Sequence, residues 1–233
     1  MKKSPLTILV IAGLLVTGLA VYRYARPPVD GPSAQAPSHG RPWQIQVEPD
    51  GTSRVFGVSL GHGTLREAVT RFGPLTEIAV IARRGEPGSL EAYYADASAG
   101  GITGKLVFGA DADPRTLEHL KANAAKTEHM ASGARKYRVS VEDLDSALAL
   151  PLGTITFIPS ASFDEHTAVA RFGQPAARIP TEAGVVHLLY PEKGLDIRLN
   201  ARGKEVLQYV APRDFERLRR PLLKARHKPD PGN

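Results

Sequence analysis

The chain of 233 residues contains no cysteine. This absence excludes disulfide bonds, thiolate metal sites, a cysteine nucleophile and a lipid attached to an N-terminal cysteine. Aromatic residues make up only 6% of the chain, and few of them accompany the basic residues near the C-terminus. Binding of nucleic acid by base stacking is therefore not supported, and no nucleic acid partner is expected.

The motifs of common catalytic and metal sites are also missing. The seven histidines include no pair at the i, i+4 spacing of a helical zinc site. No Gly-x-Ser-x-Gly nucleophile elbow occurs, and the loop GHGT at residues 61–64 lacks the lysine of a phosphate-binding loop. We therefore expect no catalytic residue, no metal, no cofactor and a non-enzymatic role.

One long apolar run is present, at residues 6–22, between Lys2-Lys3 and Arg23. Its seventeen residues are at the lower limit for a membrane-spanning helix, so residues 1–26 are predicted to be a transmembrane anchor or a signal. The positive-inside rule then predicts a single-pass protein of the inner (cytoplasmic) membrane, with most of the chain in the periplasm or outside. The alternative is cleavage near GLA at residues 18–20 and secretion to the periplasm.

The formal net charge of +6 fits either an ordinary basic surface or contact with an anionic partner. Residues 27–42 are rich in Pro, Ser and Gly and predict an extended linker. Residues 227–233 predict a disordered tail. The rest of the chain has the alternating and helical patterns of a folded α+β protein.

This folded part contains an internal repeat. RFGP at residues 71–74 returns as RFGQP at residues 171–175, and each follows a helical pattern. Glycine after the last helical turn accepts a backbone conformation that other residues avoid. Three short strand patterns and a helix opened by proline follow each copy. The prediction is two tandem repeats, at residues 43–128 and 136–226, each with a short helix, a three-stranded antiparallel meander and a following helix.

This pattern resembles the SmpA/OmlA (BamE-type) domain of bacterial envelope lipoproteins, and the tandem layout is similar to the beta-lactamase inhibitor protein family. The resemblance covers roughly residues 60–110 and 160–210. It is carried by Ala68, Val69, Phe72, Gly73, Pro74, Ala168, Val169, Phe172, Gly173, Pro175, Tyr190 and Gly203. It implies an envelope location and protein binding. The chain departs from both families by lacking cysteine.

The strands provide candidate binding residues. In LDIRL at residues 195–199 the apolar side chains alternate with polar ones, so one face of the predicted sheet is open to water or to a partner. His187, Arg198 and Gln208 are candidates for a partner-binding face. The resulting hypothesis is a membrane-tethered envelope protein that presents a duplicated module to a protein partner. The alternatives are a secreted small-ligand-binding or enzyme-inhibitor module and a hydrolase with a site between the repeats.

A separate basic cluster lies in the last predicted helix. Lipid headgroups attract such charges by about 1 kcal/mol each near an anionic surface, whereas a solvated helix end is the alternative. The candidate headgroup contacts are Arg217, Arg219, Arg220, Lys224 and Arg226.

Overall fold

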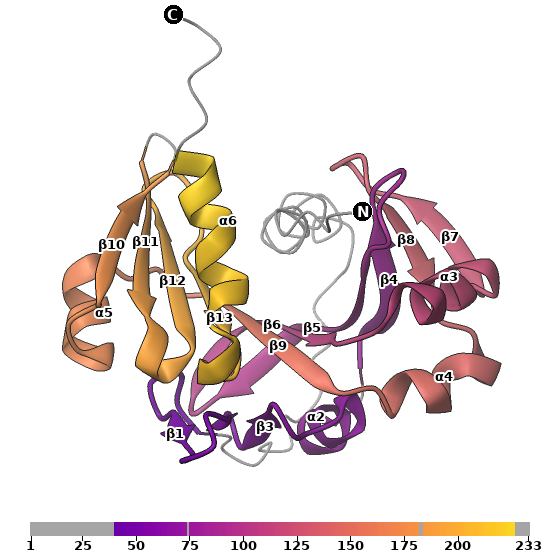
Figure 1. Cartoon of the computed structure of the whole chain (residues 1–233), viewed down its shortest axis with the longest axis horizontal. Helices are drawn as coiled ribbons and strands as arrows, with labels where there is room; N and C mark the ends of the chain where they lie inside the picture. Colours follow the sequence, from indigo (N-terminus) through magenta and orange to yellow (C-terminus); the bar gives the residue numbers. More distant parts are fainter. Residues whose placement is uncertain (1–39, 74, 182–183, 227–233) are drawn as a thin grey trace, which may run out of the picture.

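A computed structural model describes residues 40–73, 75–181 and 184–226 (Figure 1). Its main element is an antiparallel sheet of ten strands, in the spatial order β10-β11-β12-β13-β9-β6-β5-β4-β8-β7. The strands are β4 (Glu77–Ala82), β5 (Ser89–Ala99), β6 (Ile102–Ala110), β7 (Lys126–His129), β8 (Arg135–Arg138), β9 (Leu152–Pro159), β10 (Ala177–Pro180), β11 (Val185–Tyr190), β12 (Leu195–Asn200) and β13 (Val206–Tyr209).

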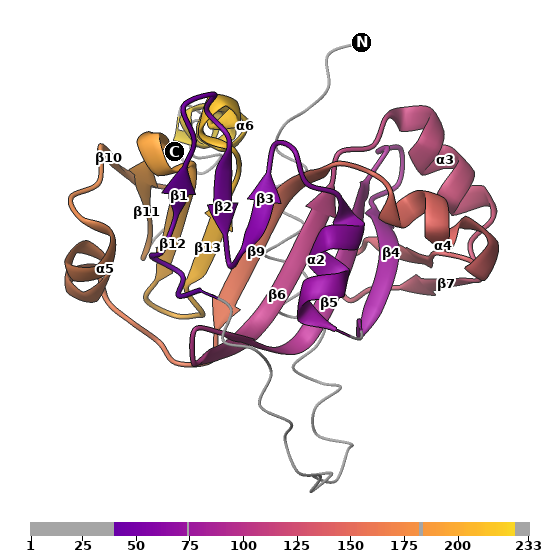
Figure 2. The ribbon, with the colours of Figure 1, turned by 90° about the horizontal axis from the view of Figure 1, so that it is seen from below.

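A smaller sheet and the helices pack around this large sheet. The small sheet contains β1 (Gln46–Val47), β2 (Ser53–Val55) and β3 (Val58–Leu60). The α helices are α2 (Leu65–Phe72), α3 (Pro114–Ala122), α4 (Val141–Leu148), α5 (Glu165–Phe172) and α6 (Glu216–Arg226), and the short 3-10 helices are η2 (Pro191–Lys193) and η3 (Pro212–Asp214). In Figure 2 the small sheet and α2 lie over the central strands of the large sheet.

The face of the large sheet that meets the small sheet and α2 is called the inner face. The pleat directs every second residue of the central strands to this face, and those residues are mostly apolar. Its buried side chains are Leu90, Ala92, Tyr94, Leu106, Phe108, Ile155, Phe157, Leu207 and Tyr209. Burial of each large apolar side chain stabilises the fold by about 1.5–3 kcal/mol. The main core therefore lies on the inner face.

The two helices of the repeated sequence end in the same way. Gly73 and Gly173 have φ of 78° and 85°, and each donates its backbone N–H to the valine carbonyl four residues earlier. The hydroxyl of Tyr94 donates to the carbonyl of Gly73 at 3.0 Å, and that of Tyr190 to the carbonyl of Gly173 at 3.1 Å. Because the geometry is the same at both places, the glycine and the tyrosine form a local packing unit that occurs twice in the chain.

A strained turn ties the small sheet to the large one. The hairpin between β2 and β3 turns at Phe56 and Gly57, both with positive φ, as a two-residue type I′ turn requires. Phe56 accepts this strain because its ring is fully buried, with centroids 5.5 Å from both Phe157 and Tyr209. The turn therefore fixes the small sheet onto β9 and β13.

The predicted fold class is wrong. The described residues are mostly β, in one continuous ten-stranded sheet and a three-stranded sheet, rather than two α+β units of helices and three-stranded meanders. β6 pairs with β9 and β9 with β13, so the strands of both halves join. β7 and β8 add to the edge at β4 and extend the sheet beyond the predicted meander. The repeat boundaries 43–128 and 136–226 stay a prediction.

The predicted membrane location is also corrected. No helix in the described parts of the chain is long and apolar enough to cross a membrane. The residues predicted as an anchor or signal, 1–26, lie outside the described residues, as do the tail at 227–233 and most of the linker at 27–42. A membrane-spanning, inner-membrane assignment therefore has no support in the structure.

Candidate functional site

The candidate site lies on the opposite side of the large sheet, called the outer face. The register places one row of residues directly across β12, β13, β9, β6 and β5, and directly opposed residues share a face. The row consists of Asp196, Gln208, Thr156, Val107 and Tyr93. The outer face is therefore much more polar at its centre than the inner face.

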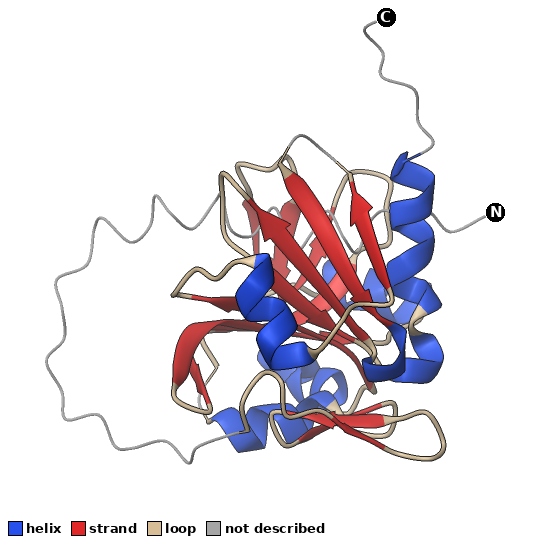
Figure 3. Ribbon diagram, turned by 90° about the vertical axis from the view of Figure 1, so that its left-hand side faces the viewer, coloured by secondary structure: helices blue, strands red, loops and turns tan. Residues whose placement is uncertain are grey.

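Helix α6 covers one end of the outer face. Phe215, Leu218 and Leu222 form a separate small core with the strand residues Ile179, Leu189 and Val210. In Figure 3 the helix runs alongside the strands of this half. Because these apolar residues recur every three or four positions, the helix presents one apolar side to the strands of this half. Arg217 is not part of that apolar side and reaches Asp111 instead.

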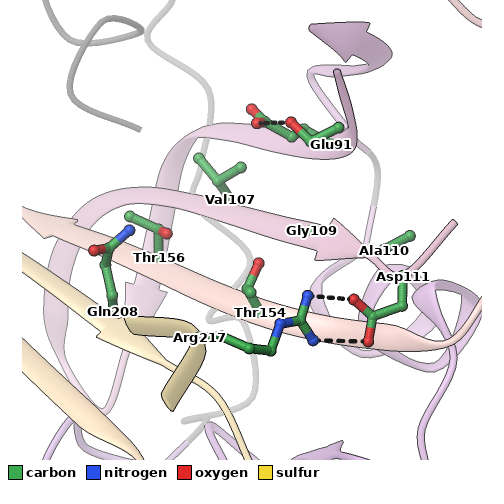
Figure 4. A pocket seen from close by; sticks show the side chains of 10 residues that line it. Glu91, Val107, Gly109, Ala110, Asp111, Thr154, Thr156, Gln208 and Arg217 are labelled. Atoms are coloured by element: carbon green, nitrogen blue, oxygen red, sulfur yellow. Dashed lines mark hydrogen bonds and ion pairs between the residues drawn. The ribbon is translucent and has the colours of Figure 1, made fainter. Parts of the chain in front are cut away.

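Arg217 connects α6 to the residue that follows β6. Its guanidinium donates two hydrogen bonds to Asp111, with Nη1–Oδ2 at 3.0 Å and Nη2–Oδ1 at 2.5 Å. This pairing raises the pKa of Arg217 above its usual value. The paired side chains are joined in Figure 4, where Asp111 follows the end of β6. The ion pair therefore ties the C-terminal helix to the centre of the large sheet.

A cavity of about 50 Å³ opens beside this ion pair (Figure 4). Strands β5, β6, β9 and β13 supply its walls, together with Asp111 and the first turn of α6. Its lining residues are Ser89, Glu91, Val107, Gly109, Ala110, Asp111, Thr154, Thr156, Gln208 and Arg217. Both halves of the chain therefore contribute to one small site.

Two glycines make room for this arrangement. A Cβ atom on Gly109 would collide with Oγ1 of Thr154, and one on Gly153 would collide with the carboxylate of Asp111. Neither glycine has a positive φ, so the backbone itself would accept another residue. Their missing side chains thus preserve space for the polar groups of the site.

Glu91 is the acidic group on the cavity's β5 wall. Its Oε1 accepts a hydrogen bond from the Ser89 hydroxyl at 2.7 Å. Its Oε2 is buried and has no hydrogen-bond partner among the described residues. Loss of hydration disfavours the charged form and raises the pKa of Glu91 to about 7, against the weaker opposing effect of Ser89. Glu91 is therefore poised between its neutral and ionised forms near neutral pH.

The other polar side chains of the cavity also have spare hydrogen-bonding capacity. Thr156 and Gln208 are only 5% and 6% exposed, and Thr154 is partly exposed. None of the three side chains makes a hydrogen bond to another described residue. Most buried polar groups in proteins are satisfied. These side chains lie on β9 and β13, and β6 separates them from Glu91 on β5.

The three residues predicted to form a partner-binding face do share the outer face. His187 lies directly opposite Arg198 on β12, and Gln208 lies opposite Asp196. His187 is only 1% exposed, and its Nδ1 lies 2.8 Å from Oδ2 of the buried Asp196. Only Arg198 is partly exposed, while Gln208 lines the cavity. The structure therefore places the three near one another and assigns them different surroundings.

The predicted headgroup contacts are engaged in different ways. Arg217 binds Asp111, whereas Arg219 and Arg220 pair with Glu216 on the same helix at 2.8 and 3.4 Å. Lys224 is exposed. The side chain of Arg226 lies outside what the structure describes. Lipid contact by this helix stays a prediction.

Two histidines away from the cavity lie beside acidic side chains. His62 Nε2 lies 2.7 Å from Asp50, and His119 Nε2 lies 3.0 Å from Asp143. Among the residues that the structure describes, no three His, Cys, Asp or Glu side chains are placed to hold a metal ion. An open groove of about 690 Å³ lies beside α2 and contains Arg66 and Arg71. Both arginines already have partners, since Arg66 binds Asp145 and Arg71 donates to the Phe56 carbonyl.

The cavity residues Glu91, Thr154 and Thr156 were not singled out by the sequence. Glu91 stands between the apolar residues Leu90 and Ala92. This alternation could have indicated that Glu91 lies on the opposite face of the strand from them. β5 and β9 are far apart in the chain and come near one another only because both pair with β6. The sequence has no local signal for this pairing.

Comparison of the chain with protein-family models, with curated proteins and with solved structures finds no match to any of them. The resemblance to the SmpA/OmlA and beta-lactamase-inhibitor families therefore stays a prediction.

Proposed function

We propose that this chain is a protein-binding module that uses the centre of the outer face. The proposal rests mainly on the cavity, which residues of both halves line and beside which the buried Oε2 of Glu91 has no hydrogen-bond partner among the described residues. Unused hydrogen-bonding groups on a well-packed sheet are expensive to maintain unless something else binds them. A rigid antiparallel sheet is also suited to present such groups in fixed positions.

The borders of this surface support a binding role. Helix α6 stands on one side, and on the other side Glu77 and Glu128 form ion pairs with Lys136. Mixed charges around a less charged centre are typical of protein interfaces. The surface thus has the composition of an interface, with the cavity near its middle.

The cavity volume favours a protein partner over a small substrate. Sites for small molecules usually enclose about 300–1,000 Å³, whereas this cavity has about 50 Å³. It can accept the tip of one side chain but not a whole metabolite. The non-enzymatic role expected from the sequence is kept as part of this proposal.

Site-specific photo-crosslinking tests the function. A photoreactive residue is placed at position 89 on the rim of the cavity, and in a control chain at the exposed position 70 on α2. We expect position 89 to give a defined cross-linked partner from the native extract and position 70 not to. Excess unlabelled chain should compete, whereas folded chain carrying Thr154→Arg should not. Equal products at both positions, or equal competition by the variant, would contradict the proposal.

A further inference from the structure

The open groove beside α2 contains two arginines that no carboxylate balances. Residues of α2, of β2 and of the turn between β2 and β3 line it, and Figure 2 shows α2 beside β3. Its charged lining residues are Arg54, Arg66, Glu67 and Arg71. Asp145 pairs with Arg66 at 2.7 Å. Among the described residues, no carboxylate lies within ion-pair distance of Arg54 or Arg71.

The turn between β2 and β3 holds both of these guanidinium groups in place. Arg71 donates from Nε to the carbonyl of Phe56 at 2.8 Å. Arg54 donates from Nη1 to the carbonyl of Gly57 at 3.4 Å. A Cβ atom on Gly57 would overlap the Arg71 guanidinium, so this group lies directly on the glycine backbone. Two charges of the same sign therefore meet at one residue of the turn, although such charges repel.

Most donors of these two arginines are available to a ligand. A guanidinium carries five N–H groups, whereas Arg54 and Arg71 each make one hydrogen bond to a described residue. Both residues are exposed and line the groove. Thr70 also lines it, and its hydroxyl makes no hydrogen bond within the described part of the chain. The groove thus offers several donors at the turn.

The only acidic residue of the lining points away from the turn. The carboxylate of Glu67 accepts a hydrogen bond from the Ser59 hydroxyl at 3.3 Å. Its other oxygen lies beside Gly63, which follows the end of β3 that is remote from the turn. The end of the groove at the turn is therefore positively charged and suited to an anion.

The two arginines favour an anion with several oxygens and more than one charge. A guanidinium fork binds carboxylate and phosphate oxygens in pairs. A carboxylate has two oxygens and a single charge, so one arginine is enough for it. A phosphate monoester presents three acceptor oxygens and a charge of about −1.5 to −2 at pH 7. This number of oxygens and this charge match two arginines.

We propose that the groove binds a small soluble phosphate monoester, with its phosphate held by Arg54 and Arg71. The groove volume of about 690 Å³ is within the range of about 300–1,000 Å³ that is usual for small-molecule sites. The organic part of the ligand then lies along α2. In the second copy of the repeat, Arg171 lies over the Trp43 ring at 4.7 Å, so only the first copy forms this site.

Inorganic phosphate isolates the recognition of the phosphate group. The whole chain is titrated with sodium phosphate in exchange for sodium chloride at constant ionic strength and pH, and amide chemical shifts are followed. We expect saturable shifts at residues 54, 57, 70 and 71. Sodium acetate presents a carboxylate and should bind at least about tenfold more weakly. Equal affinity for acetate, or shifts that only rise linearly, would overturn the proposal.

Matched variants identify the two arginines. Arg54→Gln removes a charge whose one hydrogen bond is long, so the fold should persist and phosphate binding should weaken at least about tenfold. Arg71→Gln should weaken binding to a similar extent. Arg202→Gln removes an exposed arginine between β12 and β13 and should leave binding unchanged. Thermal unfolding verifies that each variant is folded. Unchanged phosphate binding by folded Arg54→Gln would overturn the assignment of the site.

A further comparison separates a soluble ligand from a lipid headgroup. Phosphatidylcholine vesicles that contain phosphatidic acid present a phosphate monoester on a membrane surface. We expect Arg54→Gln to lose binding of glycerol 3-phosphate and to sediment with these vesicles to the same extent as the parent chain. Sedimentation that Arg54→Gln abolishes would assign the phosphate to a lipid and overturn the soluble ligand.

This site is independent of the protein-binding function. The groove and the cavity lie on opposite sides of the large sheet, since α2 and the small sheet pack on the inner face. Loss of phosphate binding in Arg54→Gln should leave cross-linking from position 89 unchanged. Failure to capture a partner at position 89 would contradict the protein-binding function and leave the phosphate site in place.

Discussion

At the scale of single residues, the environment of Glu91 has a measurable consequence for stability. An exposed glutamate has a pKa of about 4.3, whereas burial raises that of Glu91 to about 7 in the folded chain. Between these values the folded state binds more protons than the unfolded state. The contribution of Glu91 to stability therefore falls as the pH rises from about 4 to about 7, and it stays at its lower value above that.

The variant Glu91→Gln removes this titration. We expect the variant to be more stable than the parent chain by about 3–4 kcal/mol at pH 8, and not to gain stability at pH 4. Urea denaturation at both pH values measures the difference. Glu118→Gln, at an exposed site, is the control and should show no such dependence. A Glu91→Gln effect of equal size at both pH values would show that the carboxyl is not destabilised by burial.

The backbone at Gly173 provides a second residue-scale prediction. Its φ of 85° and ψ of −173° lie in a region that is almost restricted to glycine. Nothing stands within 4 Å of where a Cβ would be, so any cost of Gly173→Ala comes from the backbone alone. We expect a loss of about 1–3 kcal/mol in the free energy of unfolding.

Gly40→Ala is the matched control for this glycine. Gly40 has no positive φ, and a Cβ there would make only ordinary contacts with Gln44. Its effect should stay within about 0.5 kcal/mol. Equal effects of the two substitutions, measured by denaturant unfolding, would show that the left-handed backbone at Gly173 is not the source of the cost.

At the scale of elements, the pair Arg217–Asp111 connects α6 to the end of β6. Both side chains are partly exposed, at 34% and 45%, so the pair contributes less than a buried one would. We expect a double-mutant cycle with Arg217→Ala and Asp111→Ala to give a coupling of about 0.5–1 kcal/mol, because the contact is bidentate. The more exposed pair Arg178–Glu165 should couple less. A coupling near zero would show that α6 is held by its apolar side alone.

The elements that the sequence predicts well are those with local signals. The helical pattern that ends at RFGP is α2, with Thr64 as its N-cap accepting from the backbone of Glu67. One of the short strand patterns expected after the second copy is β11. A capping side chain, a terminal glycine or an alternating pattern specifies each of these within a few residues.

The elements that were missed depend on distant partners. The strands β7 and β8 read KTEH and RKYR, which have no apolar alternation. They are strands because β8 pairs with β4 and because Lys136 and Arg138 both bind Glu77. The pairing of β9 with β6 and with β13 is equally non-local. Because of these pairings the two expected units form one sheet. The cavity could not be predicted for the same reason.

At the scale of the whole molecule, one continuous sheet implies one cooperative unit. The ladder from β10 to β7 has no break, and β9 stands near its middle. The inner-face core also runs through both halves, from Leu90 and Phe108 to Phe157 and Tyr190. Neither half can therefore lose its strands without exposing the core of the other.

Two spectroscopic probes can test this cooperativity, since the chain has a single tryptophan. Trp43 packs edge-on against Phe172, with ring centroids 6.4 Å apart, and so reports on the half that contains α5. Far-ultraviolet circular dichroism reports on all strands. We expect the two probes to give coincident urea transitions. The central variant Phe157→Ala, which leaves a cavity in the buried core, should destabilise the chain by about 3–5 kcal/mol and move both transitions together. If the tryptophan transition separated from the circular dichroism transition, the halves would unfold independently, and the outer face could not act as one rigid binding surface.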